Sequence, residues 1–199
     1  MKVRIENEMK FTQQSFDSSY TLAQVSEFLT NYGYIITEQY EEIHYDHYYD
    51  TTDRILLKND YSARIRDCGY EKVMMIKIPI TKENGIVSRK LIVSVCDDCD
   101  ELQSFVSTYF QENIVLNEAV TLKVTRDNVV FKSDRAFILS VDKFTLDGEG
   151  CEEYVTEIEI ESGVDDRIDE FELEKLVSFI TADLGFRQTN ESKYSRALK

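Results

Sequence analysis

The chain has 199 residues, 42% of them hydrophobic, and a formal net charge of −15 at pH 7. This length is enough to bury one sizeable core, so we expect a single domain over residues 1–199. So strong a negative charge opposes a nucleic-acid-binding surface, which needs a basic face. We therefore expect no nucleic-acid polymer as a partner, and any phosphate site must be local and concentrated.

The sequence also argues against a membrane span, a signal peptide and a disulfide scaffold. No stretch approaches the roughly 20 apolar residues of a membrane span, and the first residues, MKVRIENEMKF, lack the apolar core of a signal peptide. We expect a cytoplasmic protein with no membrane association. Its four cysteines are too sparse for a disulfide scaffold, and the CxxC pair of Cys96 and Cys99 has no further ligands at zinc-site spacing. Reduced thiols with a structural or incidental role are favoured.

Hydrophobic periodicity divides the chain into strands and helices, without an internal repeat or a linker-like segment. In chain order we expect a strand at 3–12, a helix at 15–31, strands at 41–50, 62–67, 71–79 and 87–95, a helix at 100–112, strands at 122–132, 136–146 and 152–161, and a helix at 167–184. Gly33 and Gly185 follow two of these helices and suit helix C-terminal positions. Successive strands with inserted helices favour an α+β fold, an antiparallel sheet with peripheral helices, over a doubly wound parallel sheet.

Charged and apolar residues alternate along these strands. Residues two apart in a strand share a face, so Glu6, Glu8 and Lys10 point to one side of the first strand. The same alternation groups Glu157, Glu159 and Glu161; Arg64 and Arg66; Lys77; and Asp142 with Ser140. For any one strand, a half-exposed sheet with its charged face in water explains the pattern. The carboxylates, however, gather on the first and last strands while the middle strands contribute mostly Arg and Lys, which indicates two walls of opposite charge.

Such walls suit a phosphate chain with divalent cations. Three glutamates on one strand face repel one another unless a cation lies among them. Mg²⁺, Mn²⁺ or Ca²⁺ would supply that charge, because hard cations prefer oxygen ligands and Mg²⁺ shares its shell with phosphate oxygens. Arg and Lys suit the remaining phosphate oxygens, since a guanidinium donates paired hydrogen bonds and an ammonium adds mobile charge. A barrel with both groups inside would bind a phosphate chain between a metal wall and a basic wall.

These motifs resemble the CYTH domain family, also called the triphosphate tunnel metalloenzyme superfamily, and within it the bacterial inorganic triphosphatases. The matching blocks follow the family order along nearly the whole chain. They are ExExK at 6–10, an HYFDT-like segment at 47–51, RxR at 64–66, Lys-x-Pro at 77–79, basic and acidic strands with Arg126 and Asp142, ExExE at 157–161, and SKYxR at 192–196. One ExExK alone is a weak signal, but the ordered set is specific.

The resemblance implies an eight-stranded antiparallel β-barrel with peripheral helices, which forms a triphosphate tunnel. It also implies a metal-dependent triphosphatase with Mg²⁺ or Mn²⁺ as cofactor, acting on inorganic triphosphate or on a nucleoside or thiamine triphosphate. The metal ligands carried over by motif are Glu6, Glu8, Asp142, Glu157, Glu159 and Glu161, with catalytic roles for Glu6, Glu8 and Glu159. The phosphate-binding residues carried over are Lys10, Arg64, Arg66, Lys77, Arg126, Lys193 and Arg196.

One position departs from the family pattern. Many members carry Glu on the strand after Lys-x-Pro, where this chain has Leu91 and Val93. One acidic group is therefore missing, which leaves occupancy of a second metal site open. Arg89 on the same strand is either a phosphate ligand or a solvated strand end.

Two alternatives to hydrolysis stay open on these residues. One is a class IV-type adenylyl cyclase, although no sequence feature marks a base-binding pocket. The other is a non-catalytic polyphosphate- or nucleotide-binding protein that kept the basic wall. His44 and His47 lack further metal-ligating partners and are interpreted as structural. The oligomeric state is open between monomer and homodimer.

Overall fold

The computed structural model describes residues 1–13, 18–132, 136–148, 151–162 and 170–199. Its elements, in chain order, are β1 (Lys2–Gln13), α1 (Ser18–Asn31), β2 (Ile35–Asp50), α2 (Ile55–Lys58), β3 (Ser62–Asp67), β4 (Lys72–Glu83), β5 (Ile86–Val95), α3 (Cys99–Phe110), β6 (Asn117–Lys132), β7 (Ala136–Gly148), β8 (Cys151–Ser162), α4 (Glu170–Ser178), the π-helical segment η1 (Phe179–Asp183), β9 (Arg187–Thr189) and α5 (Lys193–Ala197). No helix within these ranges is long and apolar enough to cross a membrane.

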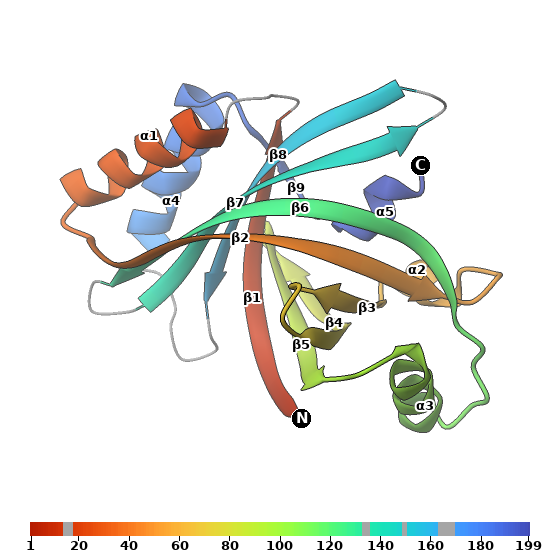
Figure 1. Cartoon of the computed structure of the whole chain (residues 1–199). Helices are drawn as coiled ribbons and strands as arrows, with labels where there is room; N and C mark the ends of the chain where they lie inside the picture. The colour runs from red at the N-terminus through yellow and green to blue at the C-terminus, as the bar shows by residue number, and fades with distance from the viewer. Residues whose placement is uncertain (14–17, 133–135, 149–150, 163–169) are drawn as a thin grey trace.

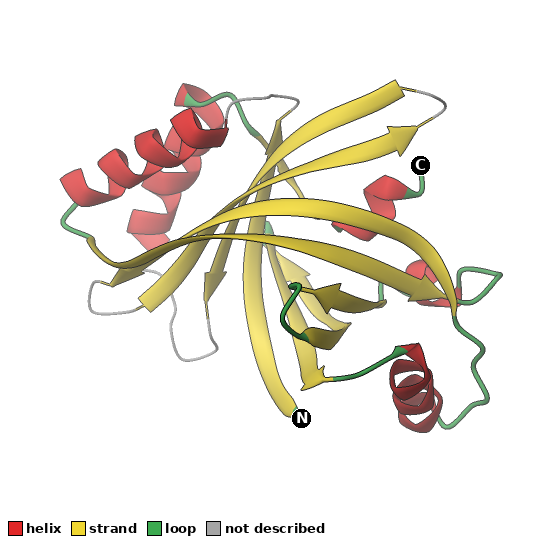
Figure 2. Cartoon of the chain, viewed as in Figure 1, coloured by secondary structure: helices red, strands yellow, loops and turns green. Residues whose placement is uncertain are grey.

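In the described part of the chain, strands β1–β8 form a closed antiparallel barrel (Figures 1 and 2). Neighbouring strands follow the order β5-β4-β3-β2-β6-β7-β8-β1, and β1 pairs in turn with β5, which closes the sheet. The short β9 adds a pairing to β1 opposite Lys10–Thr12. The predicted eight-stranded α+β barrel is confirmed.

Of the three apolar clusters that the described residues form, two lie outside the barrel wall, beneath helices. α1 and α4 lie together on one side of the barrel (Figure 1), over strand residues that include Phe11, Leu139 and Ile158. α3 covers β3–β5 through Leu102 and Val106. Because side chains alternate along a strand, outward apolar rows turn the charged rows inward. The charged faces therefore lie inside the barrel, and the half-exposed sheet is excluded.

The third apolar cluster fills the barrel interior at one end. It combines the inward-facing residues Tyr48, Val124 and Phe144 with Tyr194 of α5, which is fully buried. The Tyr48 and Tyr194 rings stack with their centroids 5.1 Å apart. α5 thus packs against this end of the barrel and carries its C-terminal residues into contact with the interior.

Some strand boundaries differ from the prediction. β2 begins at Ile35 instead of 41, and β6 at Asn117 instead of 122. These two strands pair beyond the region in which apolar alternation is visible. β4 continues past Pro79, because a register shift directly after this residue accommodates its missing N–H.

Three short elements, α2, β9 and α5, have no counterpart in the sequence-based prediction, since segments of three to five residues show no periodicity. The last predicted helix is α4 continued by η1, and Gly185 follows it with φ 73°. Gly33 follows α1 with φ 87°, as expected of a residue that ends a helix. Positions 15–17 and 167–169 of the predicted helices lie outside the described residues.

Candidate active site

The charged row of β1 lies inside the barrel. Glu6, Glu8 and Lys10 are 3%, 2% and 5% exposed. Pairing with β8 places Lys10 opposite Glu159, and pairing with β5 places Glu6 opposite Arg89. Acidic and basic side chains from distant parts of the sequence therefore meet in the interior.

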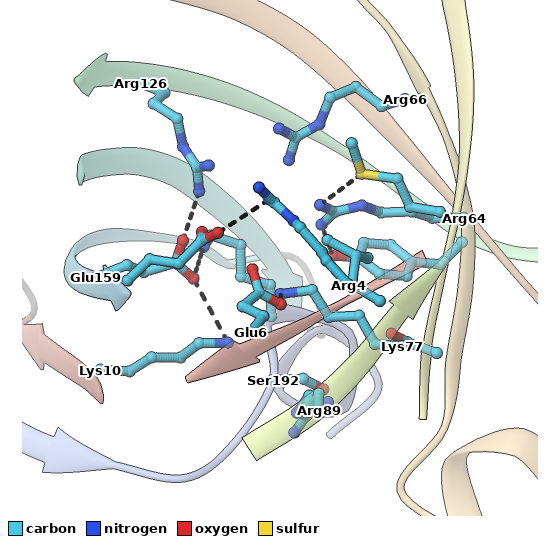
Figure 3. A pocket seen from close by; sticks show the side chains of 16 residues that line it. Arg4, Glu6, Lys10, Arg64, Arg66, Lys77, Arg89, Arg126, Glu159 and Ser192 are labelled. Carbon is cyan, nitrogen blue, oxygen red and sulfur yellow. Dashed lines mark hydrogen bonds and ion pairs between the residues drawn. The ribbon is translucent and has the colours of Figure 1, made fainter. Parts of the chain in front are cut away.

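A cavity opens between these strands (Figure 3). Among the described residues, eight lining side chains are basic: Arg4, Lys10, Arg64, Arg66, Lys77, Arg89, Arg126 and Lys193. Three are acidic: Glu6, Glu159 and Glu161. Basic residues therefore outnumber acidic residues in the described lining, whereas in the whole chain 38 acidic residues outnumber 23 basic ones. The cavity is a local site for an anion in an otherwise acidic protein.

One group of carboxylates gathers where β7 and β8 meet. Asp142, Glu157 and Glu159 each place an oxygen within 4.8 Å of the others. Lys193 Nζ lies among them, 2.7 Å from Asp142 and 2.9 Å from Glu159, and also contacts Glu157. Burial alone would raise the pKa of Asp142 and Glu159, but the neighbouring cations Arg126 and Lys193 hold both below their ordinary values. These two acids are therefore carboxylates at neutral pH.

A second acidic group surrounds Lys77 on β4. Lys77 Nζ lies 2.8 Å from Glu6 and 3.0 Å from Glu8, and Lys10 lies 3.0 Å from Glu8. Burial would raise the pKa of Glu8, but Lys10 and Lys77 lower it to about 2. Burial and the charge of Glu6 raise the pKa of Glu161 to about 7. The group thus holds ionised carboxylates beside one that titrates near neutrality.

The basic wall on β3 is organised by an acid that sequence reasoning missed. Asp46 on β2 is fully buried and accepts hydrogen bonds from both Arg64 and Arg66, at 2.8–3.0 Å. Arg126 on β6 forms ion pairs with Asp142 on the neighbouring β7 and with Glu159 on β8. The guanidinium groups are therefore fixed by carboxylates instead of extending freely into the cavity.

Several buried polar atoms of these walls have no hydrogen-bond partner among the described residues. On the basic side they include the Nε donors of Arg64 and Arg89. On the acidic side they include Glu6 Oε2 and Glu8 Oε1, which lie within ion-pair distance of lysines but accept no hydrogen bond of normal geometry. Arg89 Nε and Glu8 Oε1 lie 3.4 Å apart as an ion pair without normal hydrogen-bond geometry, so among these atoms Arg64 Nε is the donor left for a bound anion.

The segment at 47–51 anchors α5 through the Asp50 carboxylate. Asp50 accepts hydrogen bonds from Leu56 N at 2.9 Å and Leu57 N at 3.0 Å, at the start of α2. The Tyr194 hydroxyl donates to the same carboxylate at 2.8 Å. Because Tyr194 follows Lys193 directly, this contact fixes the helix that carries the cavity-lining ammonium.

The structure brings most of the predicted site residues together. Those that line the cavity are Glu6, Lys10, Arg64, Arg66, Lys77, Arg126, Glu159, Glu161 and Lys193. Glu8, Asp142 and Glu157 lie in the wall, each in an ion pair with a lining lysine. Arg196 does not join them: it contacts Glu157 and donates to Thr12 at 3.0 Å, outside the cavity lining.

Other lining residues have weaker sequence signals. Arg89 is 1% exposed, so its interpretation as a solvated strand end is wrong. Its position opposite Glu6 depends on closure of the barrel between β1 and β5. Arg4, at the start of β1, lies two residues before Glu6 and so extends the inward charged row of this strand. It donates to Glu161 at 3.0 Å. Leu91 is buried in the lining at the position where an acid is missing.

Comparisons with known proteins agree with this architecture. The model of the CYTH domain family matches residues 20–197. A presumed adenylate cyclase from Bacillus halodurans is similar over 98% of both chains, with 16% identity and a TM-score of 0.61. A presumed adenylyl cyclase from Hippeastrum, described as having a dominant triphosphatase activity, is similar over 96% of this chain and 93% of its own, with 16% identity and a TM-score of 0.58. At these identities the likeness shows the fold alone, and no curated protein sequence matches the chain.

Proposed function

The chain belongs to the CYTH domain family, and from this premise we propose that it is a divalent-metal-dependent triphosphatase, hydrolysing inorganic triphosphate or a nucleoside or thiamine triphosphate. The observation that carries the proposal is a buried cavity whose described lining combines a set of basic residues with a smaller set of acidic ones, and in which Arg64 Nε has no hydrogen-bond partner among the described residues. A buried polar group without a partner costs about 1–3 kcal/mol, and more when it is charged. A phosphate chain accompanied by divalent cations would satisfy both sets together.

The donor set of the acidic wall supports Mg²⁺ or Mn²⁺. Asp142, Glu157 and Glu159 offer only carboxylate oxygens, the ligands that hard cations prefer. Lys193 and Lys77 already place ammonium groups among the two sets of carboxylates, which shows that each set needs a positive charge. A bound divalent ion would supply polarisation of phosphate oxygens and neutralisation of charge.

The chain's own residues would bind and orient the substrate. Lys10, Lys77 and Lys193, which contact the carboxylates, would contact phosphate oxygens of the substrate. Arg64 and Arg126, each bound by acids of the barrel interior, would orient the phosphate chain through their remaining donors. Phosphoryl transfer depends mainly on such positioning and on electrostatic stabilisation, and needs no covalent nucleophile. The catalytic roles in this scheme fall to Glu6, Glu8 and Glu159.

A phosphate-release assay tests the proposal. Inorganic triphosphate, ATP and thiamine triphosphate would each be incubated with the protein and Mg²⁺ or Mn²⁺. We expect phosphate release from at least one substrate, and loss of release when EDTA removes the metal. Tight binding of triphosphate with no phosphate released under either metal would contradict the hydrolase.

One observation favours a second candidate, a non-catalytic polyphosphate-binding protein. Leu91 lines the cavity at a position where the family resemblance implies an acid, and lysines contact the acidic groups. Such a protein would bind triphosphate with similar affinity in Mg²⁺ and in EDTA. The same assay, with cyclic AMP measured as an additional product from ATP, separates hydrolase, cyclase and binding protein.

A further inference from the structure

Asp46 occupies an unusual place for an acid in a site for polyanions. It lies on the inward face of β2, opposite Arg66 in the β2–β3 pairing, and is fully buried. Its Oδ1 accepts from Arg66 Nε at 2.8 Å, and its Oδ2 accepts from Arg66 Nη2 at 3.0 Å and Arg64 Nη1 at 2.9 Å. One carboxylate therefore holds two guanidinium groups.

Both arginines keep donors beyond those that bind Asp46, although Arg64 also donates to two cavity-lining residues, to Tyr48 Oη at 3.0 Å and to Met75 Sδ at 3.2 Å. Arg64 and Arg66 line the cavity, whereas Asp46 does not and stands behind them. Arg64 Nε has no partner among the described residues, and the nearest acid to Arg66 Nη1 is Glu42 at 3.7 Å. A guanidinium has five N–H donors in a rigid fork, so donors remain for phosphate oxygens after Asp46 is satisfied.

A buried histidine two residues earlier on β2 lies beside Asp46. His44 is fully buried, with Nε2 3.6 Å from Asp46 Oδ2 and Nδ1 3.4 Å from Glu42 Oε1. Burial would raise the pKa of Asp46, but Arg64 and Arg66 hold it well below its ordinary value. The acid is thus ionised, and its hydrogen bonds come from the two arginines.

We propose that Asp46 is a positioning residue that fixes the Arg64 and Arg66 guanidinium groups in the orientation that receives the substrate's phosphates, an inference that rests on the proposed function. The alternative is that Asp46 only offsets buried positive charge. The two roles predict opposite changes in triphosphate affinity when the Asp46 charge is removed. Removing a negative charge beside a polyanion strengthens binding by simple electrostatics, whereas loss of arginine positioning weakens it.

Calorimetric titration with inorganic triphosphate in EDTA measures this without turnover. We expect Asp46→Asn to bind about tenfold or more weakly than the unaltered protein, as for loss of a charge-assisted contact. The control, Asp127→Asn, removes the same charge outside the cavity lining on β6 and is expected to stay within about twofold. Equal or tighter binding by Asp46→Asn would overturn the proposal.

A double-mutant cycle tests whether Asp46 acts through the arginines. In an Arg64→Ala, Arg66→Ala background, Asp46→Asn should produce no further weakening, because residues that act as one unit are not additive. A further loss of similar size would contradict positioning. If Asp46→Asn does not fold, Arg66→Lys provides the second variant: it keeps the charge but cannot make the two-point contact with Asp46, and unchanged affinity would overturn the proposal.

A ligand-free measurement separates failure of this inference from failure of the proposed function. In ¹⁵N-arginine NMR spectra of the unliganded protein, the Arg66 Nε–H should exchange slowly with water and lose that protection in Asp46→Asn but not in Asp127→Asn. An unprotected Arg66 Nε–H in the unaltered protein would overturn the positioning role. Protection without any triphosphate binding would contradict the proposed function instead.

Discussion

The acidic and basic walls of the cavity hold their charges in different ways. Carboxylates on β1, β7 and β8 contact flexible lysines from β4 and α5, and two of them, Asp142 and Glu159, also bind Arg126. The Arg64 and Arg66 guanidinium groups on β3 share one buried carboxylate on the neighbouring strand. A lysine can leave when another cation replaces it, whereas a guanidinium held at two points stays in place. The acidic wall is therefore suited to exchange of cations, and the basic wall to fixed recognition.

The largest effect is expected on the acidic wall. Glu159 lines the cavity and contacts Lys10, Arg126 and Lys193. Glu159→Gln removes a carboxylate that the metal-assisted reaction needs, so we expect turnover to fall by about a thousandfold or more. Binding of triphosphate in EDTA should be retained, since the substitution removes a negative charge. Phosphate release and calorimetry measure the two effects, and an exposed Glu191→Gln variant is the control.

A substitution in the basic wall should weaken triphosphate binding more than it lowers turnover. Arg64→Ala removes donors that face the cavity, and we expect triphosphate binding to weaken by about 10- to 100-fold, the range for lost charge-assisted hydrogen bonds. The rate at saturating substrate should change less than in Glu159→Gln. Steady-state kinetics across substrate concentrations separates the two. Equal and small effects of both substitutions would show that the cavity is not the active site.

Substitution of Leu91 can add an acidic group to the cavity lining. It pairs with Arg4 on β1 and with Lys77 on β4, so a glutamate there would have cations on both neighbouring strands. We expect Leu91→Glu to raise Mn²⁺ affinity and to weaken triphosphate binding in EDTA, each by about tenfold, because it adds an acid to the cavity. Leu91→Gln supplies a side chain of the same size without the charge. Unchanged Mn²⁺ affinity would mean that the acidic wall is complete without this position.

The two walls were not equally predictable from the sequence. Alternation and the separation of signs were enough to place Glu6, Glu8 and Lys10 in a charged interior, because these properties are local. Asp46 was missed, because its role depends on the pairing of β2 with β3, and one acid among histidines and tyrosines has no local signal. Arg196 matched a motif, yet its side chain turns to Glu157, because the five-residue α5 sets its direction and is too short to predict.

The smallest expected effect concerns the approach to the cavity from outside. The chain has a net charge of −15, although eight of the cavity-lining residues are basic. The long-range field therefore repels a free polyanion, while the cavity attracts it only at short range. Raising the ionic strength from about 20 to about 150 mM shortens the screening length to about 8 Å, so we expect triphosphate association to become a few-fold faster. Stopped-flow binding in EDTA measures this rate. A steady decrease with added salt would show that the basic wall dominates even at long range, and that the acidic exterior has no part in selecting how the substrate arrives.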